Sequence, residues 1–132
     1  MKHVLGLAAI AGLFILVSCT EGQASLDNQE FKLVELNGTA LESEEENPCM
    51  ISFQDNRVNA TVGCNSIFAV YASDSDGSLS FTEGGATKMA CPDEIREDEF
   101  LAAFNKVARY EWQGDTVTCY DIEGNQLFKA QK

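Results

Sequence analysis

Residues 50–62 read MISFQDNRVNATV, two short runs of alternating apolar and polar residues on either side of a turn signal. An alternation with a period of two is typical of strands that bury one face. Asp55 and Asn56 separate the two runs and belong to the residue types that favour tight turns. The pattern therefore predicts an antiparallel hairpin with strands at 50–54 and 57–62. Its inward-facing positions would be Ile51, Phe53, Val58, Ala60 and Val62.

The same period of two recurs on both sides of this hairpin. Upstream, Phe31, Leu33 and Glu35 point one way in a strand that starts near residue 29 and ends at the turn pair Asn37-Gly38. Downstream, turn signals separate further strands at 67–71, 78–82, 110–113, 116–122 and 126–130. Many short antiparallel strands indicate a curved sheet or a small barrel.

One segment departs from the period of two. Between Pro92 and Arg109 the apolar residues recur about every 3.6 positions, which predicts a single amphipathic helix. Pro92 suits its first turn, and Asp93 and Glu94 suit the positive end of its dipole. The apolar positions are Ile95, Phe100, Leu101, Phe104, Val107 and Ala108. The expected fold class is thus mainly β (α+β), a small antiparallel barrel-like sheet with one helix.

The start of the chain has the layout of an export signal. Lys2 precedes the apolar stretch 4–17, and the run Leu16-Val17-Ser18-Cys19 closes it. That run resembles a bacterial lipobox, in which the cysteine is acylated and becomes the first residue of the mature protein. We therefore expect a signal peptide at 1–18, a lipidated flexible tether at 19–28 and one domain at 29–132. The expected location is the cell envelope, anchored by lipid at the outer membrane.

Two alternatives to lipidation stay open. The apolar stretch 4–17 could span a membrane, although such helices need about 17 to 25 apolar residues. An ordinary signal peptidase could instead cut nearby and release a soluble protein.

Charge limits the possible partners. The formal net charge of the whole chain is -12, and removal of Lys2 with the signal makes it more negative by one. A polyanion is repelled by nucleic acid and by anionic lipid surfaces. We expect no nucleic-acid partner, and contact with the membrane only through the lipid anchor.

The usual groups of catalysis are missing from the expected mature chain. His3 is the only histidine and leaves with the signal, which removes the common general base and metal ligand. Asp74, Asp76 and Glu83 imitate part of a calcium loop, but Ala72 stands where an oxygen ligand is required, so a hairpin turn is favoured. Acidic clusters suited to glycosidases fall in predicted loops or on the solvent face. We expect no enzyme activity, no cofactor and no metal.

Several short motifs, in their order along the chain, resemble the META domain, or heat shock protein HslJ-like, family. The resemblance covers about residues 31–128 and is clearest at 63–68 (GCNSIF), 87–91 (TKMAC), 99–101 (EFL), 107–110 (VARY) and 121–127 (DIEGNQL). Phe31 departs from the pattern, because family members often carry tryptophan there. The resemblance implies a small barrel-like domain crossed by one helix, found in bacterial envelope lipoproteins and linked to heat shock, novobiocin resistance and motility. The motif residues it marks are Gly63, Cys64, Asn65, Thr87, Met89, Ala90 and Cys91.

Four cysteines besides Cys19 lie in the expected domain, at positions 49, 64, 91 and 119. Disulfides persist in exported proteins, and four thiols allow three pairings. Since the resemblance places Cys64 and Cys91 in the two family motifs, we pair them and assign Cys49 and Cys119 to a second, enclosing bridge. A redox pair or zinc site is the alternative, although the chain has no C-x-x-C spacing.

Three functions compete on these observations. The first is a non-catalytic envelope lipoprotein that presents a surface to another envelope component, in a stress-related role that the resemblance implies. The second is a barrel that binds a small apolar ligand, lined by Phe53, Phe68, Phe81 and Trp112. The third is a thiol enzyme.

Overall fold

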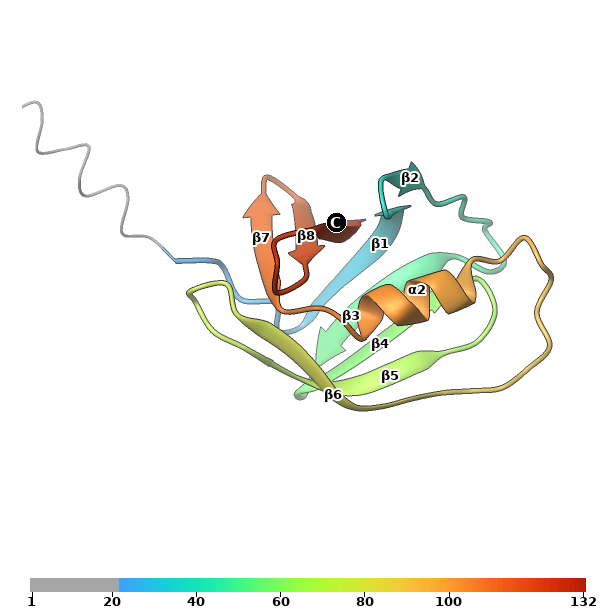
Figure 1. The fold of residues 1–132 in the computed structure, drawn as a ribbon, viewed down its shortest axis with the longest axis horizontal. Coiled ribbons are helices and arrows are strands. Elements are labelled where there is room, and N and C mark those ends of the chain that lie inside the picture. Colours follow the sequence, from blue (N-terminus) through green and yellow to red (C-terminus); the bar gives the residue numbers. More distant parts are fainter. Residues whose placement is uncertain (1–21) are drawn as a thin grey trace, which may run out of the picture.

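The computed structural model describes residues 22–132, which form one antiparallel sheet with a single helix packed on it (Figure 1). The predicted signal peptide 1–18 and the predicted lipidation residue Cys19 lie outside the described residues. Strand order is β6-β5-β4-β3-β1-β9-β8-β7, with the short β2 paired to β1. The strands are β1 (Gln29–Leu36), β2 (Thr39–Ala40), β3 (Cys49–Gln54), β4 (Arg57–Val62), β5 (Ile67–Ser73), β6 (Leu79–Ala86), β7 (Arg109–Gln113), β8 (Thr116–Tyr120) and β9 (Gln126–Gln131). This confirms the predicted fold class.

The central hairpin is the one that residues 50–62 predict. Strand β3 pairs with β4 in the register Ile51↔Ala60 and Phe53↔Val58, and these four side chains are buried. Asp55 and Asn56 have φ values of 51° and 64°, as required by the tight turn that matches strand twist. The alternation and the turn residues thus specify the same register.

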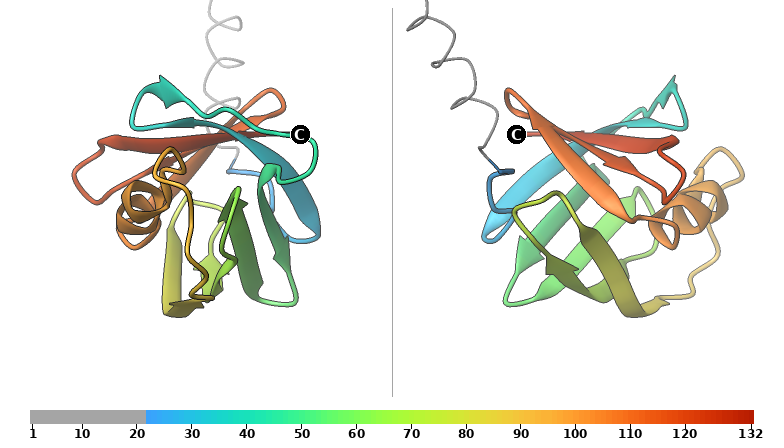
Figure 2. Two further views of the ribbon diagram at one scale, coloured as in Figure 1. Left: turned by 90° about the vertical axis from the view of Figure 1, so that its right-hand side faces the viewer. Right: turned by 60° about the vertical axis from the view of Figure 1, so that its left-hand side comes forward.

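The sheet curls into a half-barrel whose edge strands, β6 and β7, meet only at one end (Figure 2). There the backbone N–H of Leu79 donates to Ala108 O at 3.1 Å, and that of Tyr110 donates to Gly77 O at 2.9 Å. Away from this end the two edges have no ladder between them. The helix occupies the opening that remains (Figure 1).

Helix α2 (Glu97–Phe104) is shorter than the predicted 92–109. The residues before the helix form a turn, in which Ile95 N–H donates to Pro92 O at 3.1 Å. After Phe104 the backbone hydrogen bonds span three residues instead of four, and the chain then joins the sheet. Phe100 and Phe104 are buried, with ring centroids 5.2 Å from Phe128 and 4.4 Å from Phe81, respectively. The pattern overstated the helix because the flanking apolar residues Ile95 and Val107 also pack on the core, without being helical.

Strand β1 departs from simple alternation. A bulge between Leu33 and Glu35 shifts the register against β9. As a result Leu36, and not Glu35, is the third inward side chain after Phe31 and Leu33. The expected inward position of Glu35 is therefore wrong.

Residues 22–28 are fixed to the domain, whereas the sequence predicts a flexible tether there. Leu26 is completely buried in the core. The backbone N–H of Gln23 donates to Ser75 O at 2.7 Å, and Ala24 O accepts from the Tyr110 hydroxyl at 3.0 Å. The sequence signal for this docking was one large apolar residue within an otherwise small and polar stretch. In the structure the domain thus includes residues before the predicted boundary at 29.

Leu26→Ala is expected to lower the free energy of unfolding by about 2 kcal/mol, the low end for buried leucine truncation, since a segment near the start of the domain can partly close the cavity. Chemical denaturation measures the effect. The control is Ile122→Ala, because Ile122 is 84% exposed and its loss should change stability by no more than about 0.5 kcal/mol. Equal effects of the two substitutions would contradict the docking of residues 22–28.

Within the described residues, no helix has the length and apolar character needed to cross a membrane.

Candidate functional site

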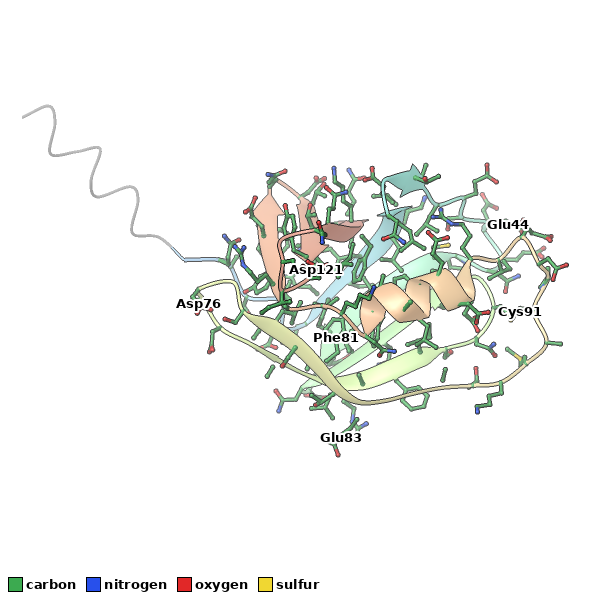
Figure 3. The ribbon with its side chains drawn as sticks, in the orientation of Figure 1. Glu44, Asp76, Phe81, Glu83, Cys91 and Asp121 are labelled. Atoms are coloured by element: carbon green, nitrogen blue, oxygen red, sulfur yellow. A yellow bond between two sulfur atoms is a disulfide. The ribbon has the colours of Figure 1, made fainter. Side chains whose placement is uncertain are left out.

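The seven motif residues come from two separate segments that meet at one end of the half-barrel. Gly63, Cys64 and Asn65 connect β4 to β5, and the loop 87–96 that follows β6 runs back alongside them. A disulfide joins Cys64 to Cys91 across 27 positions of sequence, with the Cα atoms 6.0 Å apart. The end of the domain that carries Cys91 lies opposite the end that carries Asp76 (Figure 3). We refer to these two segments, residues 63–66 and residues 87–96, together as the motif loop.

Asn65 is the buried hub of the motif loop, with 4% of its surface exposed. Its Nδ2 donates to Glu97 Oε2 at 2.7 Å and to Met89 O at 3.2 Å. Its Oδ1 accepts from Met89 N–H at 2.7 Å and from the Thr87 hydroxyl at 3.0 Å. These hydrogen-bond partners fix the orientation of the Asn65 amide, and they satisfy both its N–H donors and its oxygen acceptor. Asn65 therefore acts as a brace between two loops and the helix.

Glu97 completes this cluster, and the sequence reasoning missed it. Its Oε1 accepts a hydrogen bond from the backbone N–H of Asn65 at 2.8 Å, so the Glu97 carboxylate binds both the backbone and the side-chain amide of Asn65. Glu97 is the first residue of α2, where a carboxylate is favoured by the helix dipole. The sequence placed Asp93 and Glu94 in that role, because it began the helix five positions too early. The available signal for Glu97 was an acidic residue in the first turn of the helix, and it required the correct helix start.

Gly63 has the backbone conformation that the turn into the motif loop requires. Its φ is +113°, a region that residues with a side chain rarely adopt. A Cβ at this position would also lie 3.2 Å from Cδ1 of Ile95. Glycine thus lets the β4–β5 connection approach the loop that Cys91 and Asn65 hold in place.

A second polar cluster ties the start of α2 to the β1–β2 turn. The Arg96 guanidinium donates to both carboxylate oxygens of Glu99, at 2.9 and 2.8 Å, and to Leu36 O at 2.9 Å. Glu99 also accepts from Asn37 Nδ2 at 3.0 Å. The hydrogen bonds from Arg96, followed by that from Asn37, lower the pKa of Glu99 from 4.5 to about 2.

This lowered pKa predicts an acid-dependent contribution to stability. A carboxylate whose pKa is depressed in the folded state stabilises it fully above pH 4.5, and the contribution is lost as the pH falls toward 2. The Glu99 side chain is 41% exposed, so solvent screening limits the effect to below about 1 kcal/mol. Unfolding of Glu99→Gln and of the unchanged protein should differ at pH 7 and converge near pH 2. A difference that does not depend on pH would contradict this assignment.

The other two cysteines are free in the structure, which differs from the predicted second bridge. Cys49 lies on β3 and Cys119 on β8, and in the sheet the strands β1 and β9 separate them. Burial raises the pKa of Cys49, and it raises the pKa of Cys119 to about 12. Both thiols behave as small apolar core residues, because a reactive thiol needs a lowered pKa.

Of the four aromatic residues that the ligand-binding alternative would place around a cavity, three pack on other rings. Phe53 contacts Phe31 and Tyr71 edge to face, with centroids 6.1 and 5.0 Å away, while the Trp112 ring lies tilted against Phe31 at 5.5 Å. Phe81 lies against Phe104 of the helix (Figure 3). A ligand inside the half-barrel would have to displace these rings.

Phe68 was also expected to face inward, and this is wrong. It is 40% exposed on the outer face of β5, with its ring beside Gly85 of β6. Strand β5 buries the alternate residues Ile67, Ala69 and Tyr71.

The motif loop forms part of a groove, and among the described residues the charged ones that line it are all acidic. They are Glu42, Glu44 and Glu94. Met89, which is 60% exposed, lies in the same groove together with Asn47 and Pro92. We call this surface the acidic groove. A groove lined by an exposed apolar side chain and three carboxylates suits a ligand that carries both an apolar and a cationic group.

Comparison with known proteins shows the family and the fold of the chain. The META domain family model matches residues 24–132. No curated protein matches the chain.

Three solved structures share the fold at low sequence identity. A protein from Burkholderia xenovorans, determined by NMR, has a TM-score of 0.61 and 23% identity over 81% of this chain and 83% of its own. A second NMR structure has a TM-score of 0.65 and 19% identity, covering 80% of this chain and 90% of its own. The crystal structure of a DUF4847 family protein from Bacteroides vulgatus ATCC 8482 has a TM-score of 0.58 and 12% identity, over 80% and 93% of the two chains. At these identities the likeness concerns the fold alone.

Proposed function

The chain belongs to the META domain family, and we propose that it is a non-catalytic lipoprotein of the cell envelope that binds a basic segment of another envelope protein in the acidic groove. The observation that carries this proposal is the exposed Met89 in a groove that is also lined by Glu42, Glu44 and Glu94. A mixed apolar and charged surface of this kind favours a partner with complementary charge.

The rigidity of the motif loop supports a binding role. The Cys64–Cys91 bridge and the Asn65 hydrogen bonds hold the loop on which Met89 is presented. A surface that is ordered before binding loses less conformational entropy when the partner arrives. The motif residues thus serve to shape a surface.

The same contacts support a role without catalysis. The polar atoms of Asn65 and Thr87 are bonded to one another and to the loop backbone, and histidine occurs only at position 3. An activated nucleophile needs an adjacent base, and in this cluster the groups are used for structure.

The groove can be tested in living cells with a photo-crosslinking amino acid in place of Met89. The matched control carries it at Ile122, an exposed apolar residue in the β8–β9 turn. We expect a basic protein to be captured from position 89 alone, and capture to be lost when Glu42→Lys and Glu44→Lys are added. Identical products from both positions, or capture that survives the charge reversal, would refute the groove as the binding surface.

The lipid anchor has its own experiment. The run Leu16-Val17-Ser18-Cys19 supports acylation at Cys19, and the location that we propose for the anchored protein is the outer membrane. Cells grown with a labelled fatty acid should incorporate the label into this protein, and Cys19→Ser should abolish it. Separation of inner and outer membranes by density then gives the location. An unlabelled protein in the soluble fraction would contradict the anchor.

The physiological setting that we propose is envelope stress, for which the support is the resemblance to HslJ-like proteins. If so, capture from position 89 should increase after heat shock or exposure to novobiocin. Capture that stays the same under both treatments would contradict the setting and leave the binding surface untouched.

A further inference from the structure

The docked N-terminal segment has a consequence for how the domain stands on a membrane. We infer that the domain is held with its Gly22 end against the bilayer, so that the acidic groove points away from the lipid surface. The inference rests on the proposed lipidation at Cys19, and it adds an orientation that lipidation alone does not give.

Gly22 is the point at which the chain is fixed to the domain. A Cβ built on Gly22 would lie 2.6 Å from Ser75 O, a distance too short for a real contact, so the backbone passes close to the β5–β6 turn. The next residue, Gln23, donates its N–H to Ser75 O, and its side-chain Oε1 accepts from Trp112 N–H at 2.8 Å. Residues of the turn and of β7 thus hold this point.

The distance from the acylated residue to this fixed point is short. Gly22 is three positions after Cys19, and even a fully extended chain spans at most about 3.6 Å per residue, so that the reach is about 11 Å. A flexible tether as far as residue 28 would have tripled that reach and left the domain free to rotate. The docked segment therefore keeps one particular end of the domain near the headgroups.

That end is the one opposite the acidic groove. The described chain begins beside the β5–β6 turn at one end of the long axis (Figure 1), and Asp76 marks this end. Cys91 and Glu44 mark the other end (Figure 3). A partner in the groove would accordingly meet this protein at the far end of the domain from the bilayer.

Electrostatic repulsion favours the same upright orientation. The chain carries a formal net charge of -12, and a bilayer with anionic lipids repels such a domain within a Debye length of about 8 Å. The short tether holds one end inside this range, while repulsion moves the rest of the domain out of it. The expected result is a domain that stands on its Gly22 end.

Trp112 offers a native probe, because it is the only tryptophan and its Nε1 donates to Ala24 O at 3.1 Å, beside the fixed point. The mature lipidated protein is reconstituted in vesicles of phosphatidylethanolamine and phosphatidylglycerol that contain a headgroup-dansylated lipid. Energy transfer from Trp112 to dansyl should be efficient. A variant that combines Trp112→Phe with Glu44→Trp moves the donor to the opposite end and should transfer several-fold less.

A longer tether separates orientation from simple attachment. Fifteen Gly and Ser residues inserted between Glu21 and Gly22 should reduce transfer from the native Trp112 several-fold relative to the protein with the native tether. This comparison stays informative even if Trp112→Phe fails to fold, since it uses the native tryptophan.

The possible failures can be told apart by flotation of the vesicles. Equal transfer from the two ends, or transfer that the longer tether does not change, overturns the orientation while a floating protein leaves the anchor intact. A protein that does not float with the vesicles overturns the anchor and the orientation together.

Discussion

Replacing both bridging cysteines, Cys64→Ser with Cys91→Ser, will lower the free energy of unfolding by about 3 kcal/mol. The bridge closes a loop of 27 positions, and the constraint on the unfolded chain of such a loop amounts to about 3.5 kcal/mol, from which native-state effects usually subtract. Urea denaturation measures the loss. The paired control is Cys49→Ser, which removes an unbridged thiol and should leave the unfolded chain as constrained as before.

Thiol mapping tests the same arrangement from the chemical side. Alkylation under denaturing, non-reducing conditions should label Cys49 and Cys119, while Cys64 and Cys91 should react only after reduction. The protein should unfold at lower urea after reduction than before, and by the same amount as the double serine variant. Four protected cysteines would instead restore the second bridge that the sequence led us to expect.

Local patterns predicted the β-sheet well because the same residues that alternate also make the core. Ile51, Phe53 and Val58 illustrate this, since each position is fixed by its strand neighbours within a few residues. The errors occur where a long-range contact overrides the local pattern. Ile95 and Val107 look helical by spacing, yet they reach the core from the two segments that flank α2.

The candidate site was only partly accessible to sequence reasoning. The motif residues and the Cys64–Cys91 pairing were identified through the family resemblance. Glu97 was not, because its role depends on where the helix starts and on the return of loop 87–96 to the β4–β5 connection. Cys49 and Cys119 were paired as the two cysteines that remained, but the strand order of the sheet separates them.

Asn65→Asp is expected to destabilise the domain by about 4 kcal/mol at pH 7, the largest effect of any substitution proposed for this protein. An oxygen would replace the Nδ2 that now donates to Glu97 Oε2 at 2.7 Å and to Met89 O at 3.2 Å. Two hydrogen bonds are lost, one of them to a charged group, and two carboxylates come into contact in a partly buried site. Urea denaturation measures the loss. The control is Asn125→Asp, an exposed asparagine beside Asp121, where the same change should cost less than about 1 kcal/mol.

The loss should depend on pH in a defined direction. Burial and the neighbouring Glu97 raise the folded-state pKa of the new carboxyl above its unfolded value of about 3.9. The folded state then binds the proton more tightly, so the destabilisation is full above the raised pKa and shrinks as the pH falls toward 3.9. We expect the Asn65→Asp variant to recover at least about 1 kcal/mol between pH 7 and pH 5, relative to the unchanged protein at each pH.

A second substitution should restore the cluster if the hydrogen bonds are its purpose. In Asn65→Asp with Glu97→Gln, the new amide can donate to the new carboxylate, and its oxygen can still accept the backbone N–H of residue 65, which now donates to Glu97 Oε1 at 2.8 Å. The pair is the original one with donor and acceptor exchanged, and it no longer brings two negative charges together. We expect the double variant to regain about 2 kcal/mol over Asn65→Asp and to depend less on pH, because the charge of Glu97 is removed while the burial of residue 65 remains. Additive losses would mean that Asn65 and Glu97 stabilise the motif loop independently, and that the contact between them contributes nothing of its own.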